Sequence, residues 1–104
     1  MTETRKISHT SALILQTIHS GFMYGFDIME ITGLPSGTVY PALRRLEEDA
    51  LIQGSWEDEK SAVSDRPRRR NYQLSKVGKD ALGAALKRYP LLAQLAPEKS
   101  GRRQ

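Results

Sequence analysis

The 104-residue sequence contains no cysteine. This absence excludes disulfide bonds, thiol catalysis and zinc sites built from cysteine. The chain also has no run approaching the roughly 18 apolar residues that are needed to span a bilayer. Residues 1–6 are polar and lack the apolar core of a secretory signal peptide. We therefore expect a cytoplasmic protein that has no membrane partner.

Histidine is scarce as well, because the chain has only His9 and His19. Their spacing of ten residues does not place them on one helical turn, and no third metal ligand is evident. The sequence shows no Ser/His/Asp set, no phosphate-binding glycine loop and no outstanding pair of carboxylates. These absences predict a protein that is not an enzyme and that holds neither a metal ion nor a cofactor.

Positive charge is in excess, with 16 lysines and arginines against 12 acidic residues and a formal net charge of +4. A basic domain attracts polyanions, chiefly nucleic acid or an anionic membrane, although many small domains are basic without such a partner. The length corresponds to one domain. A chain this short buries a modest fraction of its surface, so a second copy would add useful apolar contact.

Apolar residues recur at helical spacing in the first third of the chain. The first predicted helix begins near Ser8 or Thr10, either of which can cap it, and ends at residues 20–21. The second covers residues 24–31 and stops at Gly33.

A third predicted helix follows the turn at residues 34–37, with Ser36 or Thr38 as its candidate cap. Pro41 is acceptable there because it lies near the helix start, where amides lack intrahelical partners. The apolar face repeats at i, i+4, i+7 and i+11. Its members are Val39, Leu43, Leu46 and Ala50.

Two alternating segments, residues 51–57 and 70–74, predict the strands of one hairpin. Ser75 then caps a fourth helix, which Pro90 interrupts. Three helices, a two-stranded ribbon and a further helix are the order of a winged helix-turn-helix domain. The expected fold is therefore mainly α with a small β-hairpin, and it ends in a C-terminal helix.

Residues 35–46 are the predicted recognition helix. A helix that enters the major groove needs an apolar face toward its scaffold and hydrogen-bonding groups on the opposite face. Here the small donors and open amides suit phosphate or base edges, Tyr40 can lie along the sugar-phosphate edge, and Arg44 can reach phosphate or guanine. The predicted DNA-binding residues of this segment are Ser36, Gly37, Thr38, Tyr40, Pro41, Arg44 and Arg45. The alternative is an ordinary amphipathic helix with two solvated arginines.

Four arginines lie within the five residues 66–70, and Pro67 stiffens their turn. On a wing, such a run predicts a cationic finger for phosphates or for the narrow minor groove. The predicted contacts are Arg68, Arg69 and Arg70. Strand alternation places either Arg70 with Tyr72 toward the core or the opposite set. The alternative is a solvated basic loop.

Two features beside this run leave alternatives open. The acidic residues 57–59 either pair with the arginines across the hairpin or form a solvated edge, and we favour the edge. Trp56, the only tryptophan, either packs as a half-buried strand residue on the core or forms a stacking wall for an aromatic ligand. We favour packing, because large aromatic side chains mostly supply packing.

Taken together, these segments resemble the PadR family of transcriptional regulators over about residues 13–86. The residues that carry the resemblance are 24–28 (YGFDI), 36–47 (SGTVYPALRRLE), 51–52 (LI), 66–75 (RPRRRNYQLS) and Gly78. The resemblance implies a bacterial or archaeal regulator, usually a repressor, that reads DNA with its third helix and places its wing on the backbone or minor groove. It also implies a possible small-molecule effector of aromatic or drug-like character.

The resemblance further implies a homodimer held by the C-terminal helix, which often packs on the first helix of the partner. The residues predicted for that interface are Leu13, Leu82, Ala85, Leu86 and Tyr89. A symmetric dimer predicts double-stranded DNA with a pseudo-palindromic operator as the partner. The alternative is a winged-helix module that binds protein and not DNA.

The expected organisation divides the chain into four parts. Residues 1–7 form a flexible arm, and residues 8–75 form the DNA-binding domain. Residues 76–96 form the dimerisation helix, and residues 97–104 form a disordered tail.

Overall fold

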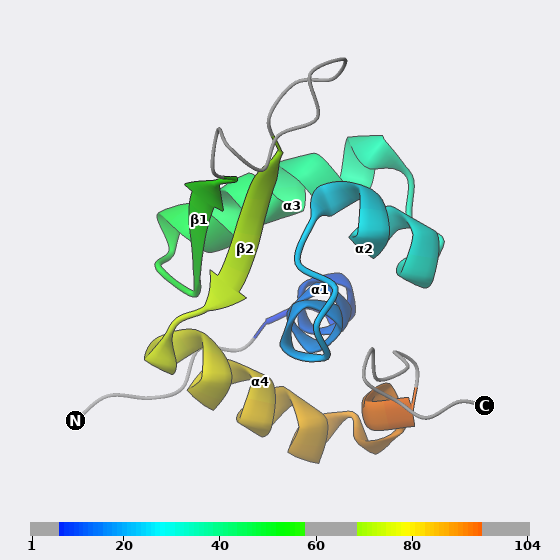
Figure 1. Ribbon diagram of the computed structural model, residues 1–104. Coiled ribbons are helices and arrows are strands. Elements are labelled where there is room, and N and C mark those ends of the chain that lie inside the picture. The colour runs from blue at the N-terminus through cyan, green and yellow to red at the C-terminus, as the bar shows by residue number, and fades with distance from the viewer. Residues whose placement is uncertain (1–6, 58–68, 95–104) are drawn as a thin grey trace.

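A computed structural model describes residues 7–57 and 69–94 of the chain. Its elements follow the predicted order of three helices, a hairpin and a fourth helix (Figure 1). They are α1 (His9–His19), α2 (Gly25–Thr32), α3 (Ser36–Glu48), β1 (Ile52–Trp56), β2 (Arg70–Leu74), α4 (Lys76–Arg88) and the 3₁₀ helix η2 (Pro90–Gln94).

Three of the predicted helix boundaries have the expected caps. The Ser8 hydroxyl accepts a hydrogen bond from the Ser11 amide at 3.0 Å, and α1 begins there. The Ser75 hydroxyl accepts one from the Gly78 amide, also at 3.0 Å, at the start of α4. Gly33 ends α2 with a φ of 76°, a left-handed conformation that glycine adopts without steric cost.

The start of α3 differs from the prediction. Its N-cap is Pro35, and neither Ser36 nor Thr38 caps the helix with its side chain. The Pro35 carbonyl instead accepts hydrogen bonds from the Thr38 and Val39 amides. Pro41 is therefore the sixth residue of α3 and lies beyond the first turn, so the reason given for its tolerance is wrong. Proline here has no N–H to donate to the carbonyl four residues earlier.

Ala50 does not continue the apolar face of α3. The helix ends at Glu48, and Ala50 is exposed with a φ of 64°. The chain reverses there, which brings the Leu51 amide to the Leu46 carbonyl at 2.9 Å. The left-handed conformation at Ala50 thus turns the chain from α3 into β1.

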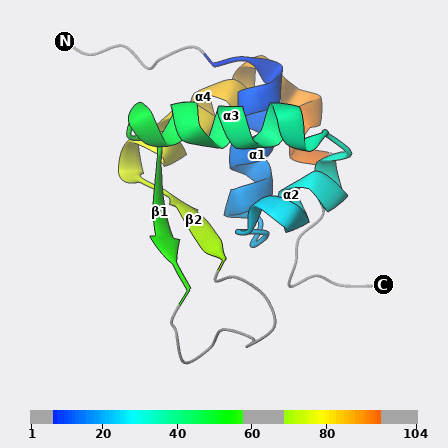
Figure 2. The same ribbon diagram turned by 90° about the horizontal axis from the view of Figure 1, so that it is seen from above.

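The hairpin pairs β1 with β2 in antiparallel register, from Ile52 opposite Leu74 to Trp56 opposite Arg70. Tyr72 faces the core and is buried. The Tyr72 amide also donates to the Met23 carbonyl at 2.9 Å, which ties β2 to the segment before α2. Figure 2 shows the hairpin extending from the end of α3 that precedes it.

The core surrounds α1, which lies between α3 and α4 (Figure 1). Ile14 and Leu15 of α1 are fully buried, as is Ile28 of α2. Ile7, which was predicted to lie in the flexible arm, is also buried in this core. Within residues 7–57 and 69–94, no helix is long and apolar enough to cross a membrane.

Pro90 ends the fourth helix, as predicted, since α4 stops at Arg88 and η2 begins at Pro90. η2 turns back onto α1 and α4 and buries Leu92 against them, while Leu91 stays exposed. Leu82 and Ala85 of α4 are buried within the single chain. Burial gives these two side chains a packing role within one chain, whereas their place in a dimer interface stays a prediction.

Candidate nucleic-acid interface

α3 has a buried face and an exposed face. Its buried residues are Val39, Ala42, Leu43 and Leu46, which include three of the four apolar residues predicted. The candidate DNA-binding residues lie on the other side. Thr38 is half-buried, and the exposed ones are Ser36, Gly37, Tyr40, Pro41, Arg44 and Arg45. The exposed face of the helix thus carries polar groups from Ser36 to Arg45 that a ligand can reach.

Tyr40 is held by α2 as well as by its own helix. Its side chain is 46 % exposed, and its ring lies over Gly25 at the start of α2. A Cβ atom at position 25 would lie 2.5 Å from Tyr40 Cε1. Glycine at this position therefore provides the space that the Tyr40 ring occupies.

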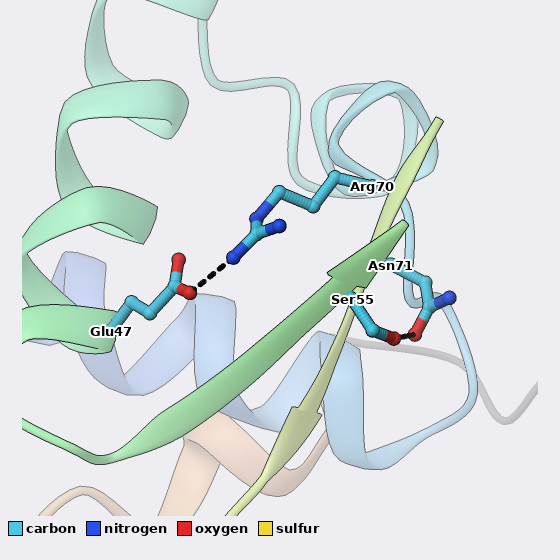
Figure 3. A network of polar contacts seen from close by, with 4 residues as sticks. All are labelled: Glu47, Ser55, Arg70 and Asn71. Carbon is cyan, nitrogen blue, oxygen red and sulfur yellow. Dashed lines mark hydrogen bonds and ion pairs between the residues drawn. The ribbon is translucent and has the colours of Figure 1, made fainter. Parts of the chain in front are cut away.

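Arg70 reaches from β2 across the hairpin to α3 (Figure 3). Its Nη2 donates to Glu47 Oε2 at 2.5 Å, and both side chains are about one-third exposed, at 30 % and 33 %. Its guanidinium carbon also lies 5.4 Å from the centre of the Trp56 ring. On the opposite face of the hairpin, the Ser55 hydroxyl donates to Asn71 Oδ1 at 3.2 Å. Tyr72 and Arg70 share the face toward α3, which selects one of the two alternations left open.

Arg69, at the start of β2, contacts different partners. Its Nε donates to Glu57 Oε1 at 3.3 Å, and its guanidinium lies 4.0 Å from the centre of the Tyr24 ring. Glu57 is only 7 % exposed. The favoured interpretation of this acid as a solvated edge is therefore wrong, and Glu57 instead pairs with an arginine across the hairpin. Arg69 itself keeps 43 % of its side-chain surface exposed.

Tyr72 lies among the groups that join the hairpin to α3. Burial raises the pKa of its hydroxyl and outweighs the neighbouring Arg70 guanidinium, which lowers it. Glu47 and Tyr40 add smaller raising effects on the same pKa. The contact between Arg70 and Glu47 joins β2 to α3 in this region.

Trp56 differs from the favoured prediction. Its side chain is 56 % exposed at the end of β1, so it does not pack on the hydrophobic core. Its ring lies beside the Arg70 guanidinium. A cation against an indole ring is attracted by the negative face of the ring, so Trp56 contributes to holding Arg70.

Of the remaining residues that were predicted to contact DNA or a second copy, some lie within the described part of the chain and one lies outside it. Arg68 lies outside the described residues, as does the rest of the loop at 58–68. Leu13, Leu86 and Tyr89 are half-buried on α1 and at the end of α4. The ring of Tyr89 lies 3.9 Å from that of His9, centre to centre, and joins these two elements.

Sequence reasoning did not identify Glu47, Gly25 and Tyr24 as partners of the predicted DNA-binding residues. One signal was available for Glu47. It lies seven residues after Tyr40, and therefore on the same helical face as Tyr40 and Arg44. The roles of Gly25 and Tyr24 depend on contacts between elements, which no local spacing reveals.

Known proteins match the chain in sequence and in fold. Residues 14–84 match the family described as "Transcriptional regulator PadR-like family". A PadR family transcription regulator from Clostridium difficile R20291 has 28 % identity and a TM-score of 0.70, with 84 % of this chain and 93 % of that one covered. No curated protein matches significantly.

Two further solved structures support the fold alone. A transcriptional regulator from Clostridium thermocellum has 20 % identity and a TM-score of 0.67, covering 83 % of this chain and 84 % of that one. A PadR-like transcriptional regulator from Bacillus cereus has 24 % identity and a TM-score of 0.60, covering 81 % and 84 %. The likeness confirms the predicted winged-helix architecture, a mostly helical chain with a two-stranded antiparallel hairpin.

Proposed function

Since the chain belongs to the PadR-like family of transcriptional regulators, we propose that it is a dimeric repressor that binds a specific pseudo-palindromic operator. It acts in the cytoplasm, where the DNA is, and it catalyses no reaction. A small aromatic or drug-like effector lowers its affinity for DNA. The observation that carries the proposal is the exposed polar face of α3, which lies beside a hairpin that carries arginine.

The proposed contacts follow from the exposure of α3. Ser36 and Gly37 supply the first amides of the helix, where the helix dipole favours a phosphate, and Ser36 and Thr38 supply small hydroxyl donors. Tyr40 and Arg44 lie next along the exposed face, and Arg44 is suited to guanine or phosphate. These contacts are made with the edges of bases in the major groove and with the adjoining backbone.

The rest of the exposed face and the wing supply further contacts. Pro41 and Arg45 border the groove, since both are exposed on α3. Arg69 keeps 43 % of its side-chain surface exposed while its Nε pairs with Glu57, so it contacts the phosphate backbone without leaving that carboxylate. Contacts to phosphate position the protein, whereas contacts to base edges determine the sequence that is read.

The proposed dimer interface includes Leu82 and Ala85, although both are buried within one chain. Its more exposed members are Leu13, Leu86 and Tyr89, which retain partial exposure on adjoining parts of α1 and α4. A shallow hollow of about 200 Å³ opens beside them and is lined by His9, Tyr89, Pro90, Leu91 and Leu92. Its exposed apolar rim at Leu91 supports a partner surface at this end of the molecule.

The test selects duplexes from a random-sequence pool with the wild-type chain and then measures Kd on the selected and on random duplexes. We expect Arg44→Ala to weaken binding to the selected duplex by about tenfold, with a smaller effect on random DNA. Lys79→Ala is the matched control, because it removes one exposed positive charge from α4 and not from α3. Failure of the wild type to enrich any duplex would contradict the proposal and favour the protein-binding module.

A further inference from the structure

Arg70 differs from a free wing arginine because its charge is already paired with a carboxylate of α3. Glu47 lies in the last turn of that helix, and its contact with Arg70 joins two elements that are 23 residues apart in sequence. Both side chains are about two-thirds buried, so solvent screens the pair less than it screens a fully exposed one. The contact is therefore a tertiary link between the recognition helix and the hairpin.

The hairpin leaves space for this link. Gly54 lies opposite Tyr72 on β1, on the face of the hairpin that carries Arg70. A Cβ at position 54 would lie 2.7 Å from Arg70 Nε, so the missing side chain provides the path along which Arg70 crosses the strand. Trp56 lies directly opposite Arg70 in the register, and the centre of its ring is 5.4 Å from the Arg70 guanidinium carbon.

Charge also argues against a phosphate as the partner of Arg70. If the guanidinium left Glu47 for DNA, a partly buried carboxylate would remain on the recognition helix, close to the phosphates. Losing one partner of a partly buried pair is costly, and the remaining negative charge would repel the duplex. Arg70 therefore contributes more to DNA binding when it is paired with Glu47 than it would as a direct contact to a phosphate.

We propose that Arg70 is a positioning residue, whose pairing with Glu47 sets the angle between the hairpin and α3 so that both reach one duplex. This inference rests on the proposed DNA-binding function and replaces the expected phosphate contact of Arg70. The pairing with Glu47 thus supports binding, although an acidic side chain near DNA would by itself be unfavourable.

The decisive measurement compares Glu47→Ala with Glu48→Ala on the duplex selected by the wild type. Each variant removes one negative charge from the last turn of α3, and Glu48 is exposed. Removing acid near DNA by itself strengthens binding or leaves it unchanged, which we expect of Glu48→Ala. We expect Glu47→Ala to weaken binding about fivefold, because it breaks the link to the hairpin.

The charge-swapped variant E47R/R70E separates positioning from direct contact. A swapped pair can hold the hairpin, so we expect its Kd to return to within about threefold of the wild type, whereas Arg70→Ala alone stays weak. A swapped variant as weak as Arg70→Ala would overturn the inference, since arginine itself would then be needed at position 70. Unfolding curves of every variant identify any loss of binding that comes from loss of the fold.

The outcomes also separate this inference from the proposed function. A wild type that selects no duplex contradicts the function, and the inference falls with it. A wild type that binds its selected duplex, together with a Glu47→Ala variant that binds equally well or more tightly, overturns the positioning role alone.

Discussion

Tyr40 is a candidate DNA-contacting residue whose position depends on the absence of a side chain at Gly25. Its ring occupies the space over Gly25, and the nearest contacts of an added Cβ are all atoms of this ring. The phenol is the far end of a side chain that can rotate, so a methyl group there moves the ring and leaves the backbone in place. The importance of the position of the Tyr40 ring can therefore be tested by a substitution at Gly25, without changing Tyr40 itself.

We expect Gly25→Ala to weaken binding to the selected duplex about as much as Tyr40→Ala does. The double variant should bind no more weakly than Tyr40→Ala alone, because both changes remove the same contact. The Kd values of the three variants test this expectation. Gly83→Ala is the matched control, since a Cβ there meets nothing within 4 Å. Wild-type affinity in Gly25→Ala would show that the position of Tyr40 does not matter.

At the scale of elements, the start of α4 is joined to the turn between α3 and β1. The Ser75 amide donates to the Leu51 carbonyl at 3.0 Å, and the Ser75 hydroxyl donates to the Ala50 carbonyl at 2.7 Å. Gly78 packs against the same turn, and an added Cβ would lie 1.9 Å from the Leu51 carbonyl oxygen. The obstacle is backbone, so it cannot rotate away.

We expect Gly78→Ala to lower the free energy of unfolding by about 2–3 kcal/mol, because α4 must move away from the turn. Urea denaturation monitored by circular dichroism measures the change. Gly83→Ala again provides the comparison, since it lies on the same helix in open space and should raise stability by up to about 1 kcal/mol. If the two variants had equal stability, the close packing at Gly78 would be contradicted.

The helices and strands were largely predictable from the sequence, whereas the contacts between them were not. Periodicity and caps predicted α1, α2, the hairpin and α4, because burial of one face and capping are local properties of the chain. The left-handed turn at Ala50 was not predicted, because alanine favours the helix and rarely adopts a positive φ.

The candidate site was likewise predictable in its local features and not in its contacts between elements. The exposed face of α3 was predicted, because its buried face was visible as a periodic pattern. The pairing of Arg70 with Glu47 was not predicted, because it depends on strand register and on the space over Gly54. Trp56 was misjudged for a related reason. It lies at the end of its strand, where the core no longer covers it.

At the scale of the whole molecule, the open question is how a small core is completed. A domain of this size buries only about two-thirds of the surface of its unfolded chain, so further apolar contact adds to its stability. The partly exposed apolar residues Leu13, Leu86 and Tyr89 lie where α1 meets the end of α4, and Leu91 is exposed beside them. This surface can be shared with a second copy, which would also place two recognition helices on one duplex.

We expect Leu86→Asp to raise the dimer dissociation constant about 100-fold or more, because a carboxylate would have to be buried unpaired in an apolar interface. Sedimentation velocity over a range of concentrations measures the shift. Gln53→Asp on the exposed side of β1 is the control and should remain dimeric. Circular dichroism shows whether the Leu86→Asp monomer keeps its helices. A folded Leu86→Asp variant that dimerises as tightly as the wild type would show that the interface lies elsewhere. The pseudo-palindromic operator would then lose the support that it draws from this dimer surface.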